Sequence, residues 1–226
     1  MARQVRSEVT RRKILDAAIG VFAEVGYAAA GWNSIIERTG MTKGALYHHF
    51  DSKESLASAI IEEGSEAVLT AVGAVCGSSS PGLENMIHGT FTLAHVLGSD
   101  ATVRAAEQLT AALSGFNKAA GQFCEGLVAL IAAQARRASA EGDLRADLDP
   151  VALSETLIGA VVGTRLMSNA MGHAVRRHGS GVADLASPRQ IWEFLLAGVA
   201  TDESLPYFRE FLARESLRHA GVDADE

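Results

Sequence analysis

Apolar residues recur at spacings of three and four along most of this 226-residue chain, and this periodicity constrains the fold more than any other feature. The spacing places apolar side chains on one face of an α-helix, whereas a half-buried strand needs strict alternation. Alanine, the strongest helix former, is abundant, and alternating β-branched runs are almost absent. We therefore predict an all-α fold, and 48% hydrophobic residues can fill its core.

Helix-breaking residues divide the chain into about ten predicted helices. The first four are expected at about residues 7–25, 33–39, 43–49 and 52–75. Five helix-spacing positions of the first helix form its buried face: Ile14, Leu15, Ala18, Ile19 and Phe22. The breakers lie at residues 26–31, 40, 77–82, 141–143 and 172–188.

Two helix starts carry recognisable capping chemistry. Asp51 followed by Glu54 has the spacing of a capping box, in which the first side chain accepts from the first-turn amides and the second reaches back. Asp149-Pro150 places an acceptor at the cap and a proline at the first helical position. We assign the acidic residues near 143–149 to helix starts, since no calcium-loop spacing accompanies them.

Charge is distributed unevenly between the two ends of the chain. Residues 1–53 carry eight Lys/Arg and five Asp/Glu, a net +3, while residues 54–226 carry a net −10 that brings the chain to −7. A cationic segment favours contact with a polyanion such as nucleic acid, and a body of net −10 is repelled by one. The alternative for the N-terminal segment is an ordinary solvated surface.

Cysteine spacing and hydropathy predict a cytoplasmic protein. Cys76 and Cys124 belong to no CxxC pair, so we expect two small core residues rather than a disulfide or a zinc site. The first apolar run, residues 14–27, is interrupted by Asp16 and Glu24, and no run of about 18 apolar residues follows. We predict neither a signal peptide nor a membrane span.

The two short helices predicted at 33–39 and 43–49 are separated only by Gly40, Met41 and a threonine. Glycine allows a tight turn, so the pair is expected to form a helix-turn-helix whose second helix projects outward. Three apolar side chains are expected to hold the pair together: Ile35, Ile36 and Leu46.

The projecting helix lies within TGMTKGALYHHFDSKESL, residues 39–56, which gathers basic and aromatic groups. Its capping threonine and small first turn let the backbone approach a groove closely, and its exposed amides favour phosphate or base acceptors. The alternative is an ordinary connector helix, and we expect Phe50 in the core and His49 in a packing or surface role. The predicted nucleic-acid contacts are Thr42, Lys43, Gly44, Ala45, Tyr47, His48 and Lys53.

Residues 7–60 resemble the DNA-binding domain of TetR-family transcriptional repressors, whose pattern is ILDAA…F…GY…I…G…TKGALYHHF…SKE.L. The resemblance implies a helix-turn-helix domain over residues 1–52, with its recognition helix at 43–49. It also implies a ligand-binding and dimerisation domain over 53–226, entered through the long helix. The match runs through Ile14 to Ala18, Phe22, Gly26-Tyr27, Ile35, Gly40, Thr42 to Phe50 and Ser52 to Glu54.

The chain departs from this family before its second helix. The family often has Thr-Ser or Thr-Thr where this chain has Ala30-Gly31, so a hydroxyl that usually contacts phosphate is lost. We expect Trp32, Asn33 or Ser34 to substitute for that contact.

The opening MARQVRSE, the TKGALYHHF helix and AVVGTR at 160–165 are similar to the γ-butyrolactone receptor subgroup of actinobacterial repressors. The resemblance implies a homodimer in which each body holds a small lactone or butenolide whose binding releases the operator. The subgroup commonly has a tryptophan where this chain has Leu127 and a glutamine where it has Gly64. We therefore expect a reshaped pocket.

Ligand pockets are mainly apolar, with a few polar groups that orient the ligand. Core packing is the alternative for each candidate residue. His88 and His95 lie seven apart on one helix face without acidic or cysteine companions, which disfavours a metal site. The candidate pocket residues are Phe91, His95, Gln108, Leu109, Phe123, Leu127, Val161, Val162 and Thr164.

The last helices carry more apolar surface than a ten-helix monomer needs, although core packing competes with this interpretation. Operator symmetry normally mirrors a twofold dimer, so we predict a homodimer. The candidate interface residues are Leu153, Leu157, Ile191, Phe194 and Leu195.

Two regulatory functions remain open. No nucleophile elbow, HExxH, P-loop or GxGxxG motif occurs, so we predict neither an enzyme nor a cofactor. The first of the two regulatory functions is that of a repressor. Its partners are double-stranded operator DNA, a small signalling molecule and a second copy of the chain, and it does not bind a membrane. The alternative is a DNA-binding regulator without a small-molecule ligand, controlled by a protein partner or by its own abundance.

Overall fold

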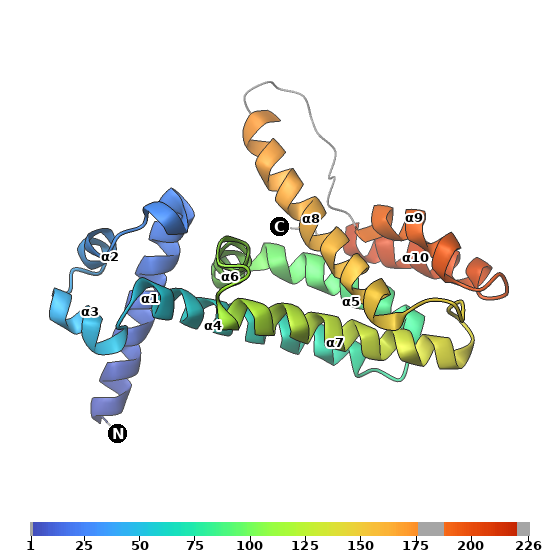
Figure 1. The fold of residues 1–226 in the computed structure, drawn as a ribbon, viewed down its shortest axis with the longest axis horizontal. Coiled ribbons are helices and arrows are strands. Elements are labelled where there is room, and N and C mark those ends of the chain that lie inside the picture. Colours follow the sequence, from blue (N-terminus) through green and yellow to red (C-terminus); the bar gives the residue numbers. More distant parts are fainter. Residues whose placement is uncertain (1, 176–187, 221–226) are drawn as a thin grey trace. The chain divides into compact units, whose positions relative to one another are not determined.

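The computed structural model describes residues 2–175 and 188–220, and these residues fold into ten α-helices (Figure 1). The predicted all-α class is confirmed. The helices are α1 (Ala2–Ala29), α2 (Trp32–Thr39), α3 (Lys43–His49), α4 (Lys53–Cys76), α5 (Gly82–Ser99), α6 (Ala101–Ala112), α7 (Lys118–Glu141), α8 (Pro150–Val175), α9 (Pro188–Val199) and α10 (Leu205–Ala220).

Helix boundaries follow the predicted breakers, with five differences, two of which are the unpredicted breaks between α6 and α7 and between α9 and α10. α1 begins at Ala2 and continues past a kink at Gly26, where φ is +76°. The break between α5 and α6 was not predicted, because it is made by the side chain of Asp100, which accepts from the amides of Thr102 and Val103. α8 extends to Val175, beyond the start of the breaker predicted at 172–188, and residues 176–187 of that breaker lie outside the described residues.

Two of the three predicted caps are confirmed. Thr42 Oγ1 accepts from the Ala45 amide at 3.3 Å, and Asp149 Oδ1 accepts from the Ala152 amide at 2.7 Å. The capping box at Asp51 and Glu54 is wrong. Because α4 begins at Lys53, Ser52 occupies the cap, and its hydroxyl accepts from the Ser55 amide while the Ser55 hydroxyl accepts from the Ser52 amide.

The helices group into two compact units. The first contains Met1–Val68 and Leu97–Cys124, and the second contains Leu69–Val96 and Glu125–Glu226. Helices α4, α5 and α7 run unbroken from one unit into the other (Figure 1). These are packing units, so the functional boundary predicted after residue 52 stays a prediction.

The core of the first unit is built on the predicted apolar face of α1. Ile14, Leu15, Ala18, Ile19 and Phe22 are all buried, as predicted. They pack in one cluster with side chains from the helix-turn-helix, from the first half of α4 and from α6: Ile35, Leu46, Leu56, Ile60, Ile61, Leu109 and Leu113.

Helices α4 and α6 approach each other closely at Gly64. A Cβ atom on this glycine would lie 2.5 Å from the Ala106 Cβ and 3.0 Å from the Thr102 carbonyl oxygen. Real Cβ atoms do not come so near to other atoms, so only glycine fits at this crossing. The glutamine that the γ-butyrolactone receptor subgroup commonly carries at this position is therefore sterically incompatible with the packing of α4 on α6.

The second unit is organised around buried polar contacts as well as apolar ones. The indole of Trp192 on α9 is fully buried and donates to Thr90 Oγ1 on α5 at 2.8 Å. Asn85 Nδ2 on α5 donates to Gln134 Oε1 on α7 at 3.1 Å. Both pairs satisfy buried polar groups that would otherwise destabilise the fold.

The prediction that both cysteines are core residues holds for one of them. Cys76 is buried in the second unit, and burial raises the pKa of its thiol to about 11. Cys124 is exposed near the start of α7.

Substituting Gly64 tests the close approach of α4 and α6. Gly64→Ala should lower the free energy of unfolding by about 1–3 kcal/mol, because the added methyl overpacks the crossing. Gly121→Ala on α7 is the matched control, since a Cβ there meets no atom within 4 Å. It should raise stability by about 0.5–1 kcal/mol through helix propensity alone. Equal midpoints of urea unfolding for both variants, at one protein concentration, would contradict this packing.

Candidate functional site

The turn between α2 and α3 has the geometry predicted for a helix-turn-helix. Gly40 adopts the left-handed conformation, with φ of +65°, and its amide donates to the carbonyls of Ile36 and Glu37 that end α2. L-residues with a side chain rarely adopt this conformation, which explains glycine at the turn. Ile35 and Leu46 are fully buried on either side of the turn. They anchor both helices in the core, so the opposite face of α3 points to solvent.

The outer face of α3 carries a cation beside an aromatic ring. The Lys43 ammonium lies 5.7 Å from the centre of the Tyr47 ring, and that ring is 5.5 Å from the ring of Trp32 on α2. Tyr47 is 43% exposed although it packs on Trp32. The three side chains therefore form one surface cluster that joins the start of α2 to the outer face of α3.

The start of α2 presents amides without a side-chain cap. Gly31 occupies the cap position in an extended conformation, and no side chain accepts from the first turn of the helix. Asn33 and Ser34 of that turn are exposed. Helix N-termini leave amides without intrahelical acceptors and carry partial positive charge, so this end suits an anion.

The remaining predicted contact residues divide by exposure. Gly44 and His48 are exposed on α3, and Ala45 is half-buried. His49 is half-buried with its ring 5.3 Å from that of His48, and Phe50 is buried in the core as predicted.

Lys53 is placed differently from the other predicted contacts. Its ammonium turns toward the end of α1, where it donates to the carbonyls of Tyr27 at 2.8 Å and Ala30 at 3.0 Å. It also lies 4.4 Å from the centre of the Tyr27 ring. The Lys53 ammonium therefore donates hydrogen bonds to carbonyls at the C-terminal end of α1, which have no partner within the helix.

Two arginines of the N-terminal segment are paired within the protein. Arg38 donates to both carboxylate oxygens of Glu24, at 2.6 and 2.7 Å, and this hydrogen bonding lowers the pKa of Glu24. Arg12 forms ion pairs with Asp16 and Glu63. Lys43, in contrast, lies exposed on the outer face of α3.

The predicted pocket residues are spread over both compact units. Leu109 and Phe123 are buried and Gln108 is exposed in the first unit, where Leu109 belongs to the core shared with α1. In the second unit His95 is exposed and the Thr164 hydroxyl donates to the Ala160 carbonyl at 2.8 Å. The other second-unit residues are buried or half-buried: Phe91, Leu127, Val161 and Val162.

An open groove of about 530 Å³ lies between α4 and α7 in the second unit, and none of the predicted pocket residues lines it. Sequence reasoning missed it because its floor is made by small residues. The signal that could have found it is the recurrence of glycine and alanine at helical spacing on both helices. The lining residues are Leu69, Gly73, Cys76, Gly77, Gly126, Ala129, Leu130, Ala133 and Gln134.

The predicted interface residues differ in how exposed they are. Leu153 and Leu157 are buried inside the single chain, which corrects their assignment as partner contacts, because the helical stripe they form packs inward. Ile191 and Leu195 are half-buried. Phe194 is 82% exposed on α9 and is available to a partner.

Comparison with known proteins agrees with this geometry. Residues 14–60 match the family model of bacterial regulatory proteins, tetR family. Over 203 residues the chain is 30% identical to the A-factor receptor protein of Streptomyces griseus, covering 88% of this chain and 67% of that protein.

Two solved structures extend the likeness over most of the chain. A gamma-butyrolactone receptor (ArpA-like protein) superposes with a TM-score of 0.72 at 26% identity, covering 94% of this chain and 99% of that one. CprB of Streptomyces coelicolor, solved in complex with its biological operator sequence, superposes with a TM-score of 0.69 at 27% identity, covering 92% and 97%. The relatives are transcriptional regulators, which confirms the prediction that the chain is not an enzyme. With its exposed α2–α3 surface and these relatives, the chain belongs to the tetR family of DNA-binding bacterial regulatory proteins.

Proposed function

We propose that the protein is a dimeric repressor that binds a palindromic operator through α2 and α3 and leaves it when a small signalling molecule binds. The observation that carries the proposal is the exposed cluster of Lys43, Tyr47 and Trp32 beside the uncapped start of α2. It agrees with the structure of CprB, which was solved in complex with its operator sequence. Such a regulator acts where the chromosome is, in the cytoplasm.

The chemistry of the cluster suits DNA. An ammonium and a phenol hydroxyl are phosphate ligands, and such contacts set the register of a helix in the major groove. The small first turn of α3 lets its backbone approach base edges, and Gly44 has open space around its Cα. Phosphate can also accept from the amides of Asn33 and Ser34, which replaces the hydroxyl lost at Ala30-Gly31.

A second copy would cover an apolar surface on the second unit. The stretch Pro150–Ser168 of α8 is long and apolar enough to pass for a membrane span by length and composition, yet only 28% of it is buried. Leu166, Met167 and Phe194 are exposed large hydrophobic side chains on α8 and α9. We assign this surface to a homodimer interface, since a second copy would bury its exposed apolar side chains.

The effector is proposed to be an alkyl γ-butyrolactone, a butenolide or a related small molecule. Support comes from the names of the A-factor receptor and of the gamma-butyrolactone receptor structures. The buried apolar side chains of Phe91, Leu127 and Val161 suit the alkyl part of such a ligand. Helix α4 begins beside α3 and continues into the second unit, so it is the proposed route by which the ligand shifts the two recognition helices.

The first operator prediction concerns Lys43 and Tyr47. Lys43→Ala and Tyr47→Phe should each weaken operator binding about tenfold or more, because each removes a hydrogen bond to a charged group. For Lys43→Ala, the slope of log affinity against log salt should fall by about two, one phosphate contact per protomer. Thermal unfolding should change little, since both groups are exposed.

Lys118→Ala is the control, because it removes the same charge from an exposed lysine outside α2 and α3. It should leave the salt slope of operator binding nearly unchanged. Equal slopes for Lys43→Ala and the unmodified protein would remove α3 from the DNA interface, as would a flat salt response of the unmodified protein.

Substituting Lys53 tests whether this lysine positions α1 or contacts DNA. Lys53→Met should lower the free energy of unfolding by about 1–3 kcal/mol, because the carbonyls at the end of α1 lose a charged donor. The salt slope of operator binding should stay the same, since the ammonium faces the protein. A reduced slope with unchanged stability would show that Lys53 binds phosphate instead.

Placing a tryptophan at either of two positions of α7 tests where the effector binds. Leu127→Trp fills the buried apolar region and restores the residue typical of the γ-butyrolactone receptor subgroup, whereas Leu130→Trp fills the open groove. We expect Leu127→Trp to shift the midpoint of DNA release by an alkyl γ-butyrolactone much more than it shifts operator affinity. By linkage, operator DNA must weaken lactone binding by the factor that lactone weakens DNA binding.

The pair of variants also distinguishes the alternatives. A shifted release midpoint for Leu130→Trp alone would move the ligand to the groove between α4 and α7. If neither a γ-butyrolactone nor a small-molecule extract of the producing cell released operator DNA, the regulator without a small-molecule ligand would replace the present proposal.

A further inference from the structure

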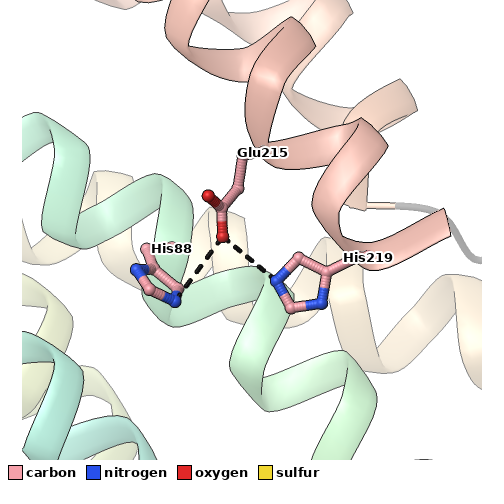
Figure 2. Close-up of side chains that lie close together, drawn as sticks. All are labelled: His88, Glu215 and His219. Atoms are coloured by element: carbon pink, nitrogen blue, oxygen red, sulfur yellow. Dashed lines mark hydrogen bonds and ion pairs between the residues drawn. The ribbon is translucent and has the colours of Figure 1, made fainter. Parts of the chain in front are cut away.

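Three side chains with metal-binding groups meet where α5 and α10 pack together (Figure 2). His88 lies on α5, and Glu215 and His219 lie one turn apart on α10. Residues four apart on a helix share a face, so Glu215 and His219 point the same way and α5 supplies the third group. The candidate ligand atoms all lie within 4.8 Å of one another.

One carboxylate oxygen is the centre of this cluster. Glu215 Oε1 lies 3.0 Å from His219 Nε2 and 3.5 Å from His88 Nε2. Ligand atoms around a tetrahedral zinc ion, each about 2.0–2.2 Å from the metal, are about 3.4 Å apart. The two separations bracket that value, so small side-chain rotations that part the imidazoles from the carboxylate can admit an ion.

The carboxylate is held in place from its other side. Arg218 donates to Glu215 Oε2 at 3.0 Å, which leaves Oε1 directed at the two imidazoles. The ring of Phe91 stacks on that of His219, with 5.1 Å between centroids, and fixes its orientation. Groups that orient the ligands in this way are the usual supporting shell of a protein metal site.

The exposures of the three side chains suit a metal site that an ion can enter from solvent. The Glu215 side chain is only 1% exposed, and Arg218 supplies part of the positive charge that a buried carboxylate needs. The side chains of His88 and His219 are 37% and 26% exposed, so water reaches both imidazoles. A divalent cation bound there would neutralise the carboxylate and use both rings.

We propose that His88, Glu215 and His219 form a site for a borderline divalent metal ion such as Zn²⁺, with one coordination position open to water. Two imidazole nitrogens and one carboxylate oxygen favour this class over Mg²⁺ and Ca²⁺, which prefer all-oxygen sites. The bound ion links the C-terminal part of α10 to α5. The site is independent of the operator contacts, and its test does not depend on DNA.

The test is calorimetric titration of Zn²⁺ into the full-length protein after treatment with a chelator and desalting. We expect one ion per chain, and Co²⁺ should give the intense visible absorption of a tetrahedral site. His88→Gln and His219→Gln should each weaken Zn²⁺ binding by about tenfold or more, because each removes one of three ligands. Circular dichroism checks that these partly exposed substitutions leave the helices intact.

His48→Gln is the matched control, because His48 and His49 form another neighbouring pair of imidazoles. Zn²⁺ should also raise the melting temperature of the parent and of His48→Gln, but not that of His88→Gln. Absence of Zn²⁺ binding, or binding that survives both His88→Gln and His219→Gln, would overturn the proposal. Loss of binding in His48→Gln alone would place the ion on α3 instead and would equally overturn it.

Discussion

Burial of α4 is the constraint on which the rest of the structure depends. In the first unit its side chains Leu56, Ile60 and Ile61 are fully buried against the helix-turn-helix and α6. In the second unit Val72 and Cys76 are buried in turn. A single helix therefore takes part in two cores, and glycine at position 64 lets α6 come close to it. Because α4 belongs to both cores, it is the element that we propose to couple effector binding to α3.

The proposed DNA-binding surface has few exposed groups, and its two helices are anchored in the core of the first unit through Ile35 and Leu46. Two cations near this surface already have partners within the protein: Arg38 pairs with Glu24, and Lys53 donates to the carbonyls that end α1. These contacts fix the helix-turn-helix to α1 and α4 rather than attract a partner. Lys43 and Tyr47 remain exposed on the outer face of α3, where the proposed operator contacts would not compete with contacts that hold the fold together. This separation of roles is why substitutions on α3 are expected to change affinity while the stability of the domain is preserved.

The proposed metal site would add a second control point on the body of the protein. His88 and Phe91 are on the same helix, and Phe91 stacks on His219. An ion on His88, Glu215 and His219 would thus restrict a side chain that is also a candidate for contact with the effector. Metal and effector would then influence each other's binding through Phe91, by the reciprocity that links any two sites in one protein.

Periodicity and local motifs were sufficient to predict the helical class, most helix boundaries, the caps at Thr42 and Asp149, and the exposed face of α3. These features depend on residues within about one or two helical turns, so spacing encodes them directly. The inward turn of Lys53, the burial of Leu153 and Leu157, and the companions of His88 were not predictable in this way. Each depends on which helix packs against which: Tyr27 and Lys53 are 26 residues apart, and Glu215 reaches His88 only because α10 packs on α5. Tertiary packing, which has no local signal, therefore decided which charges face the protein, which apolar stripe stays exposed and which histidine gains a carboxylate.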